Sequence, residues 1–166
     1  MTTNTTTIDP QSTNQPSRRR IWRWALGLVG GLLTLSIIAF VAMQMRMNYV
    51  PSNLDYATTR LSAQGIYKVS YTSDLGAVPV NQMQSWTLHV ETADGQPVEN
   101  ATITVDGDMP QHGHGLPTRP QVTRYLSNGD YQVEGLKFHM PGWWVMDFGV
   151  TANGQTDQIR FNMLLK

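Results

Sequence analysis

The fold is decided by the C-terminal stretch, in which apolar and polar residues alternate on both sides of an Asn-Gly pair: Trp144-Val145-Met146-Asp147-Phe148-Gly149-Val150 precedes Asn153-Gly154, and Ile159-Arg160-Phe161-Asn162-Met163-Leu164-Leu165 follows it. A period of two places every second side chain on the same face of an extended strand. Asn-Gly between two such runs is the strongest short signal of a β-hairpin. We therefore predict a C-terminal hairpin with one apolar face.

The same alternation continues upstream towards the N-terminus. Further strands are predicted around 67–71, 86–90, 101–105, 122–126 and 131–138, with turn signals at Asp94-Gly95 and at 127–130. Seven short strands separated by turns are typical of an immunoglobulin-like sandwich. We expect an all-β, Ig-like antiparallel sandwich of about seven strands over residues 65–166, without a repeat or a second domain.

The N-terminal part predicts a membrane anchor. The 22 residues of 24–45 carry no charge and are rich in Leu, Ile, Val, Ala and Gly, which suffices to cross a hydrocarbon layer of about 30 Å as a helix. Arginines at 18–20 and 23 precede this run, so the positive-inside rule puts the N-terminus in the cytoplasm. We predict a disordered cytoplasmic tail (1–20), a transmembrane anchor (21–46) and an extracytoplasmic, periplasmic domain. A cleaved signal peptide is the alternative, although no small-x-small cleavage site follows the run.

Residues 47–64 are predicted to link the anchor to the sandwich. Pro51-Ser52-Asn53 is a possible helix start, which gives a short helix through Leu54 to Ala63, ended by Gly65.

Charge and cysteine content exclude several functions. Residues 1–46 hold five Arg against one Asp, whereas residues 47–166 hold seven basic and eleven acidic residues. A mildly acidic domain lacks the clustered Lys and Arg that phosphate contacts require, so we expect no nucleic-acid partner. The chain has no cysteine, which rules out disulfides, thiol catalysis and cysteine-based metal sites.

Two histidine- and methionine-bearing segments are the candidate site. The first is Met109-Pro110-Gln111-His112-Gly113-His114-Gly115-Leu116-Pro117-Thr118, and the second is Phe138-His139-Met140-Pro141-Gly142. Imidazole suits copper and zinc, and a thioether selects Cu(I) over hard ions. In an extended segment the side chains of His112 and His114 would point to the same side. We predict copper ligands in His112 and His114 first, completed by Met109, Met140 and His139.

A structural role for the same loops is the competing interpretation, because a loop of Gly, Pro and His needs no metal.

His89 alternates with Trp86, Leu88 and Val90, so we expect it on the solvent face. The sequence holds no nucleophile elbow, no phosphate-cradling glycine loop and no HExxH motif. We therefore expect a binding domain and not an enzyme.

Several segments together resemble the YtkA-like and FixH-like family of membrane-anchored extracytoplasmic β-sandwich domains. They are Trp86-Thr87-Leu88-His89-Val90, Asp94-Gly95-Gln96-Pro97-Val98, Ala101-Thr102-Ile103, the loop 109–118, Asp130-Tyr131-Gln132-Val133-Glu134-Gly135-Leu136-Lys137-Phe138 and Met140-Pro141-Gly142-Trp143-Trp144. The resemblance covers roughly residues 56–152, and a single N-terminal span is also usual for FixH-like proteins.

The resemblance implies a link to copper. FixH-like members are associated with the assembly of a copper-containing terminal oxidase, alongside a copper-exporting ATPase. It implies a membrane complex or a copper-transport protein as partner, and it carries the ligand role onto His112, His114, Met109 and Met140. One position departs from the pattern, because many relatives carry a histidine where this chain has Gln84. The alternative function is a metal-free interaction module or an accessory subunit of a membrane complex.

Overall fold

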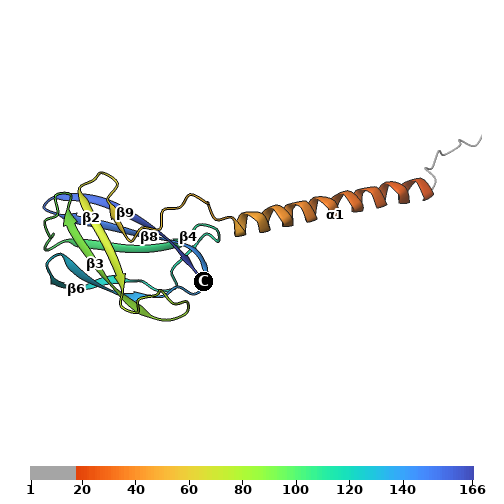
Figure 1. Cartoon of the computed structure of the whole chain (residues 1–166). Coiled ribbons are helices and arrows are strands. Elements are labelled where there is room, and N and C mark those ends of the chain that lie inside the picture. The colour runs from red at the N-terminus through yellow and green to blue at the C-terminus, as the bar shows by residue number, and fades with distance from the viewer. Residues whose placement is uncertain (1–17) are drawn as a thin grey trace, which may run out of the picture. The chain divides into compact units, whose positions relative to one another are not determined.

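The computed structural model describes residues 18–166, so the predicted tail at 1–17 lies outside the described residues. The chain divides into two units, residues 1–46 and 47–166 (Figure 1). Helix α1 (Arg18–Asn48) lies in the first unit except for its last two residues, and the second unit contains the strands.

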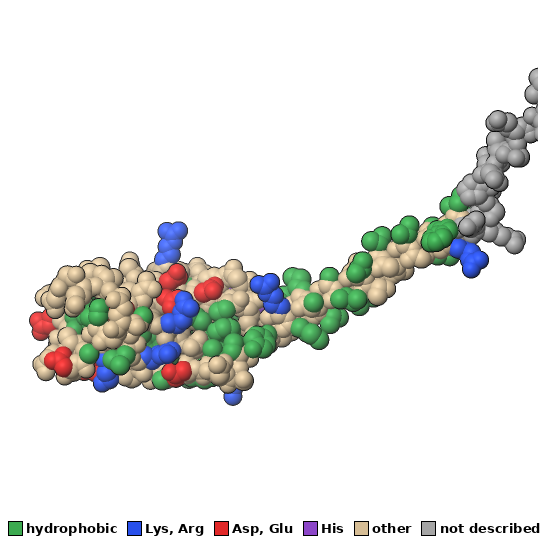
Figure 2. All heavy atoms as spheres, turned by 90° about the horizontal axis from the view of Figure 1, so that it is seen from above, with side chains coloured by type: hydrophobic (Ala, Val, Ile, Leu, Met, Phe, Trp, Pro, Cys, Tyr) green, Lys and Arg blue, Asp and Glu red, His purple; other side chains and the backbone are tan. Residues whose placement is uncertain are grey.

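Helix α1 begins three residues before the predicted anchor and ends two residues after it. Residues 21–48 are long and apolar enough to cross a membrane. Its large apolar side chains are exposed along the helix, as Figure 2 shows. The hydroxyls of Thr34 and Ser36 donate hydrogen bonds to the carbonyls of Gly30 and Leu32, which satisfies both polar groups within the helix. The helix ends before Pro51, whose ring disfavours helical geometry at the preceding residue.

Nine strands form two antiparallel sheets in residues 47–166. One sheet has the order β1-β2-β3-β7-β6 and the other β5-β4-β8-β9. Their bounds are β1 Thr59–Leu61, β2 Tyr67–Ser73, β3 Gln84–Thr92, β4 Thr102–Met109, β5 His114–Gly115, β6 Gln121–Ser127, β7 Asp130–Leu136, β8 Gly142–Ala152 and β9 Gln155–Leu165.

The seven longer strands confirm the Ig-like prediction. Taken in chain order as A to G, they pair as A-B-E-D in one sheet and C-F-G in the other, which is the order of a constant-type immunoglobulin domain. The predicted short helix at 54–63 is wrong, because Thr59–Leu61 adds a strand to the edge of β2 instead. The visible face of the domain carries interspersed acidic and basic side chains (Figure 2).

The predicted hairpin at 144–165 is confirmed. Ala152 pairs with Gln155, and the two residues between them, Asn153 and Gly154, have φ values of 52° and 76°. Positive φ at both turn positions defines the tight turn whose twist matches that of the flanking strands. The apolar faces of both strands pack into one core between the sheets, with Trp86, Leu88 and Val90 of β3 opposite.

The segment before β2 covers the outer edge of β9. Ala63 N donates to Gln158 O, the Arg60 guanidinium donates to Arg160 O, and the Asn162 amide donates to Asp55 O. The linker is therefore hydrogen-bonded to the middle of this edge strand, at Gln158, Arg160 and Asn162.

Candidate metal centre

The first histidine segment forms a tight turn between β4 and β5. Met109 O accepts hydrogen bonds from both His112 N and Gly113 N, at 3.0 and 2.9 Å. Gly113 has a φ of 67°, which a residue with a side chain rarely adopts. The predicted extended geometry is therefore wrong for His112, although His114 lies in a strand.

The three candidate histidines nevertheless come together. The ring centroids of His112 and His114 are 5.6 Å apart with an interplanar angle of 22°, and those of His114 and His139 are 4.8 Å apart at 43°. Two imidazoles bound to one ion through bonds of about 2 Å at a tetrahedral angle have centroids about 5 Å apart. Both separations fall near that value, and His114 occupies the middle of the cluster.

Two ring nitrogens of this cluster are buried without a hydrogen-bond partner. Among the described residues, His114 Nδ1 and His139 Nδ1 belong to a set of four such side-chain atoms, with Gln84 Nε2 and Thr118 Oγ1. Buried polar atoms are nearly always paired in folded proteins, so each exception requires an explanation. An ion held between His114 and His139 would satisfy both nitrogens, so these residues fit a metal.

The electrostatic surroundings keep His139 neutral. Burial lowers the pKa of the His139 imidazole, and the neighbouring His114 and the Lys137 ammonium lower it further. Metal ions bind the neutral imidazole, because protonation removes the lone pair. His139 is therefore ready to bind an ion at neutral pH.

Trp144 of β8 forms the inner wall of the cluster. Its ring centroid lies 5.5 Å from that of His139, nearly perpendicular to it, and 6.2 Å from that of His114. The indole Nε1 donates a hydrogen bond to Met140 O, which fixes the β7–β8 loop against β8. Trp144 is fully buried, so it holds the loop histidines against the core.

The two candidate methionines differ in their surroundings. Met109 is fully buried and is the direct cross-strand partner of His114, which puts both side chains on the same face of the sheet. Met140 is half-buried and packs against the core. Met109 is thus the cross-strand neighbour of His114, and Met140 follows His139 directly in the chain.

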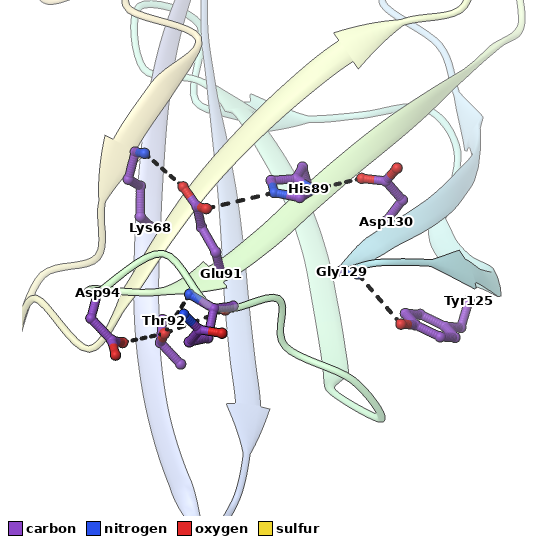
Figure 3. A network of polar contacts seen from close by, with 9 residues as sticks. Lys68, His89, Glu91, Thr92, Asp94, Tyr125, Gly129 and Asp130 are labelled. Atoms are coloured by element: carbon purple, nitrogen blue, oxygen red, sulfur yellow. Dashed lines mark hydrogen bonds and ion pairs between the residues drawn. The ribbon is translucent and has the colours of Figure 1, made fainter.

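The fourth histidine belongs to a separate polar network on the outer face of the first sheet, as expected. His89 Nδ1 lies 2.6 Å from Asp130 Oδ1, and its Nε2 lies 3.8 Å from Glu91 Oε2 (Figure 3). Lys68 Nζ donates to the other oxygen of Glu91 at 2.6 Å. Lys68 lowers the pKa of the Glu91 carboxyl, with a smaller contribution from His89. These residues form a charged row across β2, β3 and β7.

Carboxylates do not complete the histidine cluster. Across residues 18–166, no group of three or more His, Asp and Glu side chains is arranged to hold an ion. Any ion bound here would therefore need ligands other than His, Asp and Glu, and the methionine sulfurs are the candidates.

Gln84 is a structural residue of the core. Its Oε1 accepts hydrogen bonds from Trp86 Nε1 and from the Ser73 hydroxyl. The sequence contained no signal for this role, because Gln84 and Ser73 meet only through the pairing of β2 with β3.

A long apolar helix is followed in the chain by a two-sheet, Ig-like β-sandwich domain, in which three histidines from two loops lie close together. The YtkA-like family model matches residues 63–148, which is more than half of the chain, and the protein belongs to this family. No curated protein and no solved structure matched it.

Proposed function

We propose that this YtkA-like protein is a membrane-anchored, extracytoplasmic copper-binding domain. The observation that carries the proposal is the pair of buried, unpartnered Nδ1 atoms on His114 and His139, whose rings lie 4.8 Å apart. Copper accepts both imidazole and thioether ligands, which are the two ligand types that this cluster offers.

His114 and His139 would form the centre of the site. His112 stacks on His114 from outside this pair, because no three His, Asp or Glu side chains of residues 18–166 are arranged to hold one ion, and Met109 and Met140 would supply sulfur. Trp144 and the β7–β8 loop orient His139 through the hydrogen bond from the indole to Met140 O. The role of the chain would be to hold and hand over the ion, and no catalytic step is proposed.

The proposed location follows from helix α1. The arginines in its first turns, which precede the apolar run, and the length of that run favour an uncleaved anchor with a cytoplasmic N-terminus. The sandwich would then lie outside the cytoplasm, where it could serve the assembly of a metal-containing membrane complex.

A metal-free interaction module is the second candidate, and one observation favours it. Met109 is fully buried within the hydrophobic core, where a side chain needs no metal to account for it. On this hypothesis the histidine loops would stabilise one end of the sandwich or contact a membrane protein.

Copper titration of the full-length protein in detergent separates the two candidates. We expect one equivalent to bind, and we expect a His114→Ala/His139→Ala variant to lose that binding. His89→Ala is the matched control, because it removes a histidine that lies in the network of Figure 3. No binding by the parent protein, or binding unaffected by the double variant, would overturn the copper site.

A further inference from the structure

The turn that carries the first histidine segment, the histidine turn (109–115), is tied to the residue that follows helix α1. Gln111 Nε2 donates a hydrogen bond of 2.8 Å to Tyr49 O, and both residues belong to the second unit of the chain. Tyr49 directly follows Asn48, the last residue of α1. The histidine turn is therefore held beside the residue at which the chain leaves the helix.

The place of Tyr49 in the chain sets its height above a membrane that α1 crosses. The uncharged run ends at Met45, and Tyr49 lies three residues beyond Arg46, the first charged residue after that run. Three residues span about 4.5 Å at the helical rise of about 1.5 Å per residue. The headgroup layer on each side of the hydrocarbon core is about 5–8 Å thick. Tyr49, and with it the side chain of Gln111, would then lie at the level of the headgroups.

Two further loops and the end of β9 lie at the same end of the sandwich as the histidine turn. The β7–β8 loop carries His139, whose ring contacts that of His114. The β2–β3 loop runs beside it, because Asn81 N donates a hydrogen bond of 2.7 Å to Phe138 O. Strand β9 ends here as well, since its last residue pairs with the first residue of β8.

The exposed apolar side chains of the domain are concentrated at this end. Within residues 47–166, seven large apolar side chains are exposed, and five of them lie in the linker, in the β2–β3 loop or at the end of β9. These five are Tyr49, Tyr56, Leu75, Met83 and Leu164. The other two, Leu61 and Leu126, lie towards the opposite ends of β1 and β6.

A groove of about 560 Å³ continues this apolar surface. Its walls include Tyr56, Tyr71, Val78 and Leu164, so the linker, the β2–β3 loop and the end of β9 all contribute to it. Contiguous apolar surface that is exposed on a folded domain marks a contact with a protein or a membrane. Tyrosine is enriched where proteins meet the membrane–water interface.

Charge also favours a lipid surface at this end. The loops between strands carry Asp74, Arg119 and Lys137 here, whereas those at the opposite end carry only the acidic Asp94 and Glu99. Anionic headgroups attract Lys and Arg and repel carboxylates. The end with the histidine turn is therefore the one that a lipid surface repels less.

We infer that this end of the sandwich lies on the lipid surface of the membrane that α1 crosses, with Leu75, Met83 and Leu164 in contact with lipid. The inference rests on the membrane anchor of the proposed function and is independent of the copper site. A partner that exchanges an ion with the histidine cluster would then have to present its own binding site at the membrane surface.

The test uses spin labels on the full-length protein in vesicles of zwitterionic and anionic phospholipid. Because the chain has no cysteine, one introduced cysteine carries a single nitroxide at a chosen position. The label's collisions with oxygen, which concentrates in lipid, are compared with its collisions with a water-soluble nickel complex. We expect the label of Met83→Cys to report lipid and that of Leu126→Cys to report water, although both native side chains are exposed, by 54% and 40%. Leu33→Cys, within α1, should report lipid and checks the anchor.

A second set of variants tests the apolar contact itself. Leu75→Ser/Leu164→Ser removes two of the exposed apolar side chains, so it should raise the collision rate of the Met83→Cys label with the nickel complex towards the rate at Leu126→Cys. Leu61→Ser/Leu126→Ser is the matched control, because it removes the exposed leucines of the other end. It should leave the Met83→Cys label unchanged.

The outcomes separate the inference from the proposed function. A Met83→Cys label as exposed to water as the Leu126→Cys label would overturn the lipid contact and leave a protein as the partner of this surface. An equal effect of the two double variants would also overturn it. Exposure of the Leu33→Cys label to water would overturn both the anchor and the inference. The samples contain no copper, so the result does not depend on whether the cluster binds an ion.

Discussion

The Cε methyl of Met109 lies 2.8 Å from the point that a Cβ atom on Gly142 would occupy. Gly142 also has a φ of 127°, which side chains rarely adopt. The contact joins the last residue of β4 to the first residue of β8, directly beneath the histidine turn. The backbone angle therefore demands glycine at 142, and the terminal methyl of Met109 would have to shift to admit a side chain.

We expect Gly142→Ala to lower the free energy of unfolding by about 2–4 kcal/mol, because it combines backbone strain with overpacking against Met109. Urea unfolding measures this. Gly154→Ala is the control: its φ is also positive, at 76°, but no atom lies within 4 Å of the added methyl. Gly154→Ala should lower the free energy of unfolding only by the backbone strain, about 1–2 kcal/mol. Equal losses in the two variants would show that Met109 moves aside freely.

The three histidines should contribute unequally to copper affinity. His114 and His139 carry the buried, unpartnered nitrogens, whereas His112 lies in the turn. Removal of a residue that only supports a metal ligand typically weakens metal binding about 10- to 100-fold. We expect His112→Ala to weaken copper binding by no more than this. We expect His114→Ala and His139→Ala each to weaken it by more. Copper competition assays on the single variants give this order. A His112→Ala variant that binds most weakly would reverse the assignment.

Asp157 should make the stability of the domain depend on acid pH. Burial acts to raise the pKa of its carboxyl, but hydrogen bonds from the Ser62 hydroxyl and from the backbone N–H groups of Gln158, Gln64 and Ile66 outweigh burial and lower it. A lowered folded-state pKa stabilises the fold fully above the unfolded value of about 3.9, and this contribution is lost as the pH falls through the folded value.

Asp157→Asn should therefore be less stable than the parent at pH 7, and the difference should shrink below about pH 4. Chemical unfolding at a series of pH values tests this. A difference that stays constant down to pH 2 would show that the carboxylate charge is not responsible.

The N-terminal helix should remain part of the mature protein. An uncleaved anchor predicts that protein purified from membranes still contains the apolar run at 24–45. Cleavage of a signal peptide would instead remove the apolar run and release the domain into the soluble fraction. Mass spectrometry of the membrane fraction decides between the two.

The fold was largely predictable because apolar and polar residues alternate along its longer strands. The apolar positions of Trp86, Leu88 and Val90 and of Trp144, Met146 and Phe148 are all fully buried. Strands β1 and β5 were missed because three and two residues are too few for a period to register. The helix expected at 54–63 failed because pairing with β2 outweighed a weak local signal.

The candidate site was predictable in its residue types but not in its geometry. Spacing suggested that His112 and His114 form the pair, whereas the structure brings His114 closest to His139, through the packing of two loops far apart in sequence. The role of Trp144 as the inner wall was also missed. Its position on the core face of β8 was evident, but its contact with the histidines depends on where the loops fold back.

The hydrogen bonds between residues 55–63 and β9 affect whether copies of the protein associate with one another. An eleven-residue strand at the edge of a sheet presents unpaired backbone groups that can recruit a strand from a neighbouring molecule. Proteins anchored in a membrane meet one another often, because diffusion is confined to a plane. By occupying Gln158 O and Arg160 O, the linker blocks this route to aggregation, so a truncation that removes residues 47–64 should produce a domain that self-associates.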